Sequence, residues 1–229
     1  MFFAVPTRFH DSHPRDAIPL ANGLIVVANV LAFALGRSPY WLVGPGTGVL
    51  SVITYAFAHA SWWHLLGNMW VLLVFGNPAN RRLGNFYYTL TYLGSALALG
   101  IIARFLCHGY LLGSSGAIFA VIAVCITLMP ACLVDVYYLA VFPLSLLLGL
   151  VHRPQHWVYW FIRWDHFSLR ALWAILLVPL LEVWGLFWWG WNWTNLGHLL
   201  GLFCGLAAVL MLPSAITIKG RRPAWTFDA

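Results

Sequence analysis

Charged residues are scarce in this chain of 229 residues. Asp, Glu, Lys and Arg together make up 8% of it, against roughly 25% in a typical soluble domain. Hydrophobic residues make up 62%, so there are too few polar side chains to cover the surface of a water-soluble protein of this length. The composition therefore excludes an ordinary soluble domain and indicates a polytopic membrane protein.

Paired cysteines are also lacking. At least two of the four cysteines fall inside apolar runs, where cysteine behaves as a small hydrophobic residue, and we expect neither disulfides nor a cysteine metal site. A basic face with interleaved aromatic residues is lacking too, so the net charge of +6 indicates membrane topology and no nucleic-acid partner. The four cysteines are Cys107, Cys125, Cys132 and Cys204.

Six apolar segments are the expected membrane spans, at about 20 residues for one bilayer crossing. A polar leader (1–16) precedes them and a basic tail (214–229) follows them, so one membrane domain covers 17–213. Basic residues near span ends mark the cytoplasmic side, which places both termini in the cytoplasm. The spans are 17–36, 58–76, 86–106, 115–129, 169–191 and 195–212.

A serine between glycines opens the fourth span, in the stretch Gly113-Ser114-Ser115-Gly116. At the start of a helix the free N–H groups and the helix dipole favour an anion, which is what oxyanion chemistry requires. Glycine and serine are also the residues that membrane helices use to pack closely, so a purely structural role is the alternative.

The second span contains three polar residues, His59, His64 and Asn68. Polar side chains inside a span are costly and mark functional positions by default. His64 and Asn68 are four apart and share a helix face, as a functional pair or as hydrogen-bonded residues that join helices. His59 and His64 are five apart, about 140° around the axis, and no His-Glu-x-x-His occurs, so we expect no metal.

The sixth span carries a histidine beside a stripe of glycines. Gly197, Gly201 and Gly205 allow this helix to approach another closely, and His198 lies on an adjoining part of the surface. A lone histidine in a span is often a packing residue. One that lies beside a glycine stripe and faces a serine at a helix start fits a nucleophile and its general base.

These three motifs, in this order, resemble the rhomboid intramembrane serine proteases over roughly residues 17–213. The resemblance implies an all-α bundle of six transmembrane helices with a long connection between spans 4 and 5. It implies that Ser115 is the nucleophile and His198 its base, in a dyad without an acid. It further implies an oxyanion hole of His64, Asn68 and the Ser115 N–H, with Gly113 and His59 as supporting residues and Gly116, Phe119 and the three glycines as packing residues.

Two positions depart from the family pattern. Phe119 stands where many members have a tyrosine that packs on the base, so its ring can pack there without a hydrogen bond. Asn80 replaces the acidic residue that follows the second span in the family, so this position has no charge for an ion pair in that loop. The Trp-Arg pair of the first outer loop is absent from residues 37–58. None of these changes touches Ser115 or His198.

The implied activity is peptide hydrolysis in transmembrane protein substrates through an acyl-enzyme, without a cofactor, in the lipid bilayer of a bacterial inner membrane. An inactive relative that binds transmembrane segments as a scaffold or chaperone is the alternative, and the sequence specifies no oligomeric state. A transporter would need ionisable residues across the bilayer, whereas the polar groups here cluster at one depth. Glu182 is the exception, as a hydrogen-bond partner inside its span or a gate residue.

Residues 131–168 are ambiguous, because 131–151 is apolar enough to span but contains Asp135 and Pro143. A second crossing between Ser115 and His198 would carry them to opposite faces of the membrane. We therefore predict a cytoplasmic or re-entrant connection that lies at the inner interface, with Trp157, Trp160 and Trp164 at headgroup level.

Overall fold

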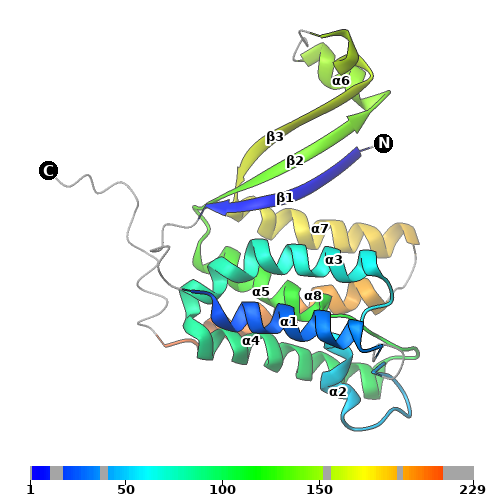
Figure 1. Cartoon of the computed structure of the whole chain (residues 1–229), viewed down its shortest axis with the longest axis vertical. Coiled ribbons are helices and arrows are strands. Elements are labelled where there is room, and N and C mark those ends of the chain that lie inside the picture. The colour runs from blue at the N-terminus through cyan, green and yellow to red at the C-terminus, as the bar shows by residue number, and fades with distance from the viewer. Residues whose placement is uncertain (1, 11–17, 37–40, 152–155, 190–192, 214–229) are drawn as a thin grey trace, which may run out of the picture.

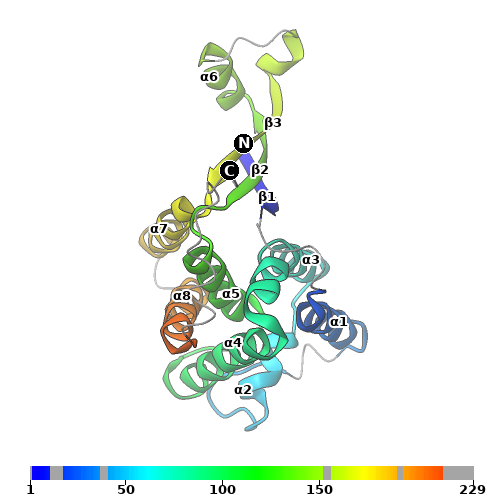
Figure 2. The same cartoon turned by 90° about the vertical axis from the view of Figure 1, so that its left-hand side faces the viewer.

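The computed structural model describes residues 2–10, 18–36, 41–151, 156–189 and 193–213. Most of them are helical, and the long helices lie side by side in one bundle (Figure 1), which Figure 2 shows nearly end-on. The rest of the expected leader (11–16) and the expected tail (214–229) lie outside the described residues. The helices are α1 (Leu20–Ala34), α2 (Ser51–Thr54), η2 (Tyr55–Phe57), α3 (Trp62–Val71), α4 (Asn77–Leu106), α5 (Ser115–Leu128), α7 (Ala171–Trp189) and α8 (Trp193–Met211).

A glycine divides the longest helical stretch of the chain into two arms, which correspond to the second and third expected spans. Helix α3 continues through the π-helical turn η3 (Leu72–Gly76) into α4, as one helical stretch of 45 residues, Trp62–Leu106. Gly84 interrupts this stretch with φ 73° and ψ 166°, a conformation that only glycine adopts readily. The chain turns back there, so the residues before and after Gly84 form two neighbouring arms (Figure 1).

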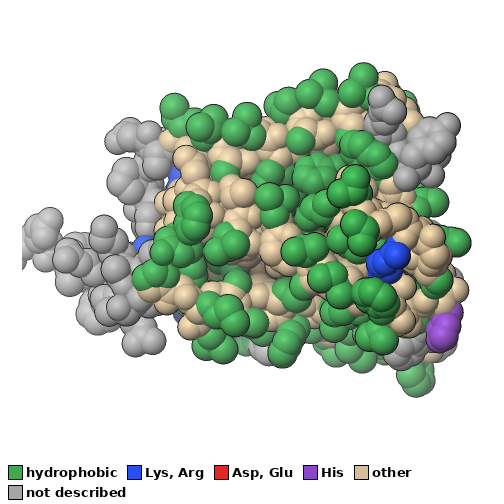
Figure 3. All heavy atoms as spheres, turned by 90° about the horizontal axis from the view of Figure 1, so that it is seen from below, with side chains coloured by type: hydrophobic (Ala, Val, Ile, Leu, Met, Phe, Trp, Pro, Cys, Tyr) green, Lys and Arg blue, Asp and Glu red, His purple; other side chains and the backbone are tan. Residues whose placement is uncertain are grey.

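The helices suit a membrane in length and surface. Trp62–Leu106 and Trp193–Met211 are long and apolar enough to cross one, while Leu20–Ala34, Ser115–Leu128 and Ala171–Phe187 are shorter apolar helices. Helix α4 exposes large apolar side chains such as Phe86, Leu90 and Phe105, and Figure 3 shows a face of the bundle covered mainly by hydrophobic side chains, with few charges. Such a surface indicates contact with lipid.

Helices α5 and α8 are parallel neighbours, with α5 inside the bundle and α8 at its edge (Figure 2). A Cβ atom on Gly201 would lie 2.1 Å from the carbonyl oxygen of Gly116, and one on Gly205 would lie 2.2 Å from that of Ala120. Only glycine fits at these two positions of α8, so the predicted close approach of this helix to the serine helix is present.

Neutral amides join α1 to the helical arms. The Asn22 side-chain NH₂ donates to the Leu72 carbonyl oxygen (3.1 Å) and to Asn77 Oδ1 (2.8 Å), and its oxygen accepts from Tyr88 Oη. Asn80 Oδ1 accepts from the Asn22 backbone N–H at 3.0 Å. At the position where the family resemblance expects an acid, an uncharged hydrogen-bond network therefore connects α1 with α4.

The all-α expectation needs a correction, because a three-stranded antiparallel sheet is present. Its order is β1 (Phe2–His10), β2 (Leu133–Val141) and β3 (Ile162–Arg170). The first strand comes from the expected polar leader. The other two form a hairpin whose far end carries α6 (Leu144–Val151) and η4 (Trp157–Trp160).

The hairpin is also the expected connection at 131–168. It does link α5 to α7, but it projects from the bundle as strand, helix and strand (Figures 1 and 2), which corrects the prediction of a chain lying along the interface. The physical reason is the content of β-branched and aromatic residues in Leu133–Val141, which favours a strand and was masked by the overall hydrophobicity of the segment.

The sheet is attached to the bundle through β1. The rings of Phe9 and Phe75 meet edge to face with centroids 6.0 Å apart, and Trp70 Nε1 donates to the Pro6 carbonyl oxygen at 2.7 Å. Within the sheet, Asp135 of β2 accepts a hydrogen bond from the Ser168 hydroxyl (2.5 Å) and lies 2.7 Å from His10 Nε2. These hydrogen bonds, from Ser168 first and then His10, hold the pKa of Asp135 below its usual value.

Candidate functional site

The serine motif forms the start of α5. Gly113 has φ 111°, and its N–H donates to the Tyr55 carbonyl oxygen at 2.9 Å, which fixes the turn before the helix. Ser115 is the first helical residue and half-buried, so it lies among the N–H groups that have no partner within the helix. The neighbouring Ser114 is fully buried, with its Oγ 3.3 Å from His59 Nε2.

His198 lies near the N-terminal end of α8, beside this turn. A small cavity of about 40 Å³ is lined by both Ser115 and His198, together with Gly113, Tyr55 and other residues of these segments. The Phe119 ring stacks on the His198 ring, with centroids 4.1 Å apart and planes 8° apart. The structure therefore brings the predicted nucleophile and the predicted base to one cavity and packs Phe119 on the base.

Polar residues of α3 and the segment before it approach the same turn. A Cβ on Gly113 would lie 2.9 Å from ring atoms of His64 and 3.8 Å from Asn68 Nδ2. His59 is buried, and its ring meets that of His64 edge to face at 5.0 Å. Asn68 Nδ2 is buried without a hydrogen-bond partner among the described residues, which leaves an amide donor available beside the start of α5.

The start of α3 is fixed by a cap, which sets the position of His64. The Ser61 side chain accepts a hydrogen bond from the His64 backbone N–H at 3.2 Å, as an N-cap serine does. The first turn of α3 therefore holds His64 at a defined height beside Gly113.

The glycines at the site differ in what they do. Gly116 faces Leu99, whose Cδ1 would be 2.6 Å from an added Cβ, and Gly201 and Gly205 allow the helices to approach. Gly197 has open space where its Cβ would be. Gly201 and Gly205 are therefore required by contacts with backbone atoms, Gly116 meets only the flexible end of the Leu99 side chain, and Gly197 makes no close contact at this position.

Glu182 of α7 contacts the histidine directly. Its Oε1 lies 3.0 Å from His198 Nδ1, and its Oε2 accepts from Asn195 Nδ2 at 2.7 Å. Gly185 makes room for this contact, because a Cβ there would lie 2.5 Å from Asn195 Nδ2. The sequence left two roles open for Glu182, a hydrogen-bond partner inside its span or a gate residue. In the structure Glu182 is a hydrogen-bond partner. The sequence signal for it was a lone carboxylate in an apolar span.

The fold and this group of residues define a helical membrane protein with a serine and a histidine at adjoining N-terminal ends of two parallel helices. The family model "Rhomboid domain" matches residues 46–215, which is most of the chain. The chain belongs to the rhomboid family.

Curated relatives are similar at a moderate level. The chain is 31% identical to Rhomboid protein 1, mitochondrial, of Saccharomyces cerevisiae over 134 residues (51% of this chain, 38% of the relative). It is 31% identical to the human Presenilin-associated rhomboid-like protein, mitochondrial, over 137 residues (52% and 35%). It is 31% identical to Rhomboid-like protein 11, chloroplastic, of Arabidopsis thaliana over 74 residues (31% of this chain, 26% of the relative). The matches span about a third of the length of these relatives.

These relatives overturn the expected location. The comparison contradicts the prediction of a bacterial inner membrane, because the names of the similar curated proteins describe them as mitochondrial or, in one case, chloroplastic.

Proposed function

We propose that the chain is an intramembrane serine endopeptidase that cleaves transmembrane protein substrates. The observation that carries this proposal is the shared cavity, in which Ser115 at the start of α5 and His198 of α8 face the same small space. Membership of the rhomboid family supports it. A mitochondrial membrane, as in the names of the relatives, is the location we propose with it.

The chemistry follows from the arrangement of these groups. Ser115 Oγ attacks the carbonyl carbon of the scissile bond, while His198 Nε2 takes up the hydroxyl proton and passes it to the leaving amine. Water then hydrolyses the acyl-enzyme ester by the same proton transfers. The Ser115 N–H, His64 and Asn68 donate to the oxyanion, and each such donor contributes on the order of 3 to 4 kcal/mol to transition-state stabilisation.

The proposed topology has six spans: α1, the two arms of Trp62–Leu106, α5, α7 and α8. Parallel packing of α5 and α8 requires an odd number of crossings between them, and α7 supplies one.

The direct test reconstitutes the full chain in liposomes with a single-span model substrate that has small residues near one end of its span. We expect two products, with the cut mapped by mass spectrometry, and none with Ser115→Ala. A wild-type protein that co-purifies with the substrate but never cuts it would contradict the proposal and identify the chain as a binding member of the family.

A further inference from the structure

We propose that Glu182 is a positioning residue that turns the expected dyad into a Ser115–His198–Glu182 triad. This inference rests on the proposed function. It departs from the acid-free dyad that the family resemblance implies, and it starts from the 3.0 Å contact between Glu182 Oε1 and His198 Nδ1.

The contact is sheltered and specific. The side chains of His198 and Glu182 are only 17% and 14% exposed. Glu182 is the only glutamate in the sequence, and a carboxylate inside a span is costly unless it has a partner. Its second oxygen accepts from Asn195 at 2.7 Å, so both carboxylate oxygens have a donor from α8.

The contact determines which histidine nitrogen is the base. A carboxylate only accepts hydrogen bonds, so Nδ1 carries the proton and Nε2 keeps its lone pair. Among the described residues, His198 Nε2 is buried and has no hydrogen-bond partner. With Phe119 stacked on the ring face, the imidazole is held on one edge and one face, and the free nitrogen remains available for the serine proton.

The same carboxylate stabilises the imidazolium that forms during proton transfer. Coulomb attraction between opposite charges at this distance is strong away from bulk water. Among the described residues, titratable side chains near this position include His64, which interacts electrostatically with His198, and Tyr55, which lines the cavity. Neither carries a negative charge at neutral pH, so Glu182 is the group that opposes the new positive charge.

Glu182→Gln tests this role because it keeps the shape of the side chain and removes the charge. We expect kcat to fall by about 100-fold or more, as with loss of a triad carboxylate elsewhere, with KM and melting temperature close to those of the wild type. The acidic limb of the pH–rate profile should move to lower pH, because the imidazolium has lost its counter-charge. Glu182→Asp should recover part of the rate.

The matched control is Asn195→Ala, which removes the second partner of the carboxylate and keeps the charge. It should lower the rate much less than Glu182→Gln and leave the pH profile in place. A Glu182→Gln protein with wild-type rate and pH profile, while Ser115→Ala is inactive, would overturn the triad and leave the protease intact. A wild-type chain without any cleavage would instead overturn the proposed function itself.

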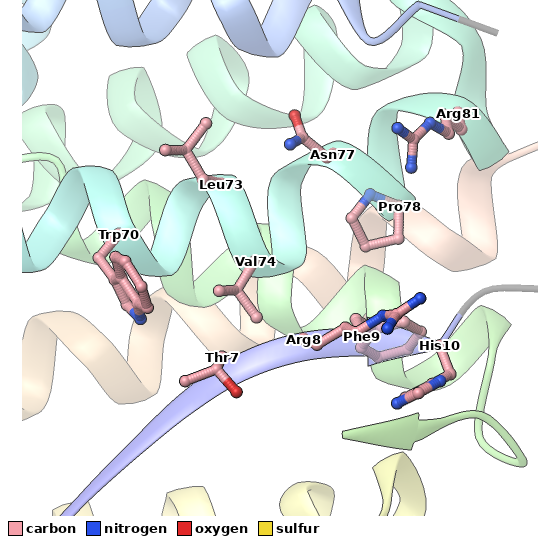
Figure 4. A pocket seen from close by; sticks show the side chains of 10 residues that line it. All are labelled: Thr7, Arg8, Phe9, His10, Trp70, Leu73, Val74, Asn77, Pro78 and Arg81. Carbon is pink, nitrogen blue, oxygen red and sulfur yellow. The ribbon is translucent and has the colours of Figure 1, made fainter. Parts of the chain in front are cut away.

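A separate groove supports a second inference, independent of catalysis. It has a volume of about 420 Å³ and lies between β1 and the α3–α4 arm (Figure 4). Arg8 and Arg81 come from its two opposite walls, with His10 at the same end and Trp70 at the other end (Figure 4), and none of the ten lining residues is acidic. His10 of this groove lies 2.7 Å from Asp135 Oδ2.

We infer that this groove binds the phosphate headgroup of an anionic membrane lipid. Guanidinium groups match phosphate oxygens in geometry and charge. One end of the groove reaches Arg81, near the end of the helical arm that also carries Arg82, and the basic end of a membrane span is where lipid headgroups are met.

The test measures binding of phosphatidylglycerol to the detergent-solubilised full chain, by native mass spectrometry and by thermal shift. We expect phosphatidylglycerol to be retained and to raise the melting temperature, and phosphatidylcholine to do neither. Arg8→Gln with Arg81→Gln should lose the effect, and the double lysine variant should keep most of it. Arg104→Gln, at the far end of α4, should behave as the wild type.

Two results would overturn the lipid site. Inorganic phosphate at equal concentration giving the same shift would identify a free-phosphate site. Retention of phosphatidylglycerol by the double glutamine variant would show that the two arginines do not form a site.

Discussion

Two buried polar clusters in the same bundle differ in how fully their hydrogen bonds are satisfied. Around Asn22, both amide hydrogens and the amide oxygen have partners, from Leu72, Asn77 and Tyr88. Around Ser115, Asn68 Nδ2 and His198 Nε2 are buried without partners among the described residues. Buried polar groups are normally paired, and each exception calls for an explanation. The paired cluster fits a structural role, and the unpaired groups fit a role toward substrate.

The largest effect expected from this contrast is at the serine and the histidine. Ser115→Ala and His198→Ala should each abolish cleavage of a model substrate, because Ser115 is the one serine and His198 the one histidine among the described residues that line the cavity, and both should leave the melting temperature near that of the wild type. Ser114→Ala is the matched control and should retain cleavage, since its hydroxyl contacts His59. Cleavage by Ser115→Ala at the wild-type rate would assign the nucleophile elsewhere.

The next effect concerns the oxyanion donors. Asn68→Ala and His64→Ala should lower turnover by roughly ten- to a thousandfold, because each removes one of several donors, whereas His59→Ala should act more through stability. Turnover and thermal unfolding are measured on the same preparations. An Asn68→Ala protein that loses stability in proportion to activity would make Asn68 a structural residue like Asn22.

The converse change breaks the paired cluster. Asn22→Ala removes three side-chain hydrogen bonds between α1 and the helical arms and should cost about 2 to 4 kcal/mol of stability. Activity per folded molecule should stay near that of the wild type, because the network does not reach the site. Unfolding in detergent measures the stability, and active-site titration measures the activity per folded molecule. A stable but inactive Asn22→Ala protein would contradict the assignment of a structural role to the Asn22 cluster.

The smallest effect is expected in the sheet. The pKa of Asp135 is lowered by its partners, so its ionised form contributes stability above the unfolded-state pKa of about 3.9 and loses this contribution as pH falls through the folded-state pKa. Asp135→Asn should therefore weaken attachment of β1 at neutral pH, by at most about 1 kcal/mol. Hydrogen exchange of β1 should be faster in the variant at pH 7, with the difference vanishing in acid. Equal exchange at pH 7 would show that Asp135 does not hold the strand.

Where local signals were strong, the sequence predicted the helices and the close approach of α8 to α5. Glycines mark the turn before Ser115 and the contact of α8 with α5. The hairpin was missed because hydropathy alone does not separate a buried span from a strand rich in aromatic residues. The contact between Glu182 and His198 depends on the rotation of α7 against α8, which side-chain packing sets and no single-chain pattern encodes.

The most direct test of the central claim is the site of modification by a serine-directed fluorophosphonate. The wild-type chain in membranes should acquire one adduct, mapped by mass spectrometry to the peptide that contains Ser115. Labelling should disappear in His198→Ala and slow strongly in Glu182→Gln. An adduct on another residue, or none on the folded wild-type chain, would contradict the assignment of Ser115 as a nucleophile activated by His198.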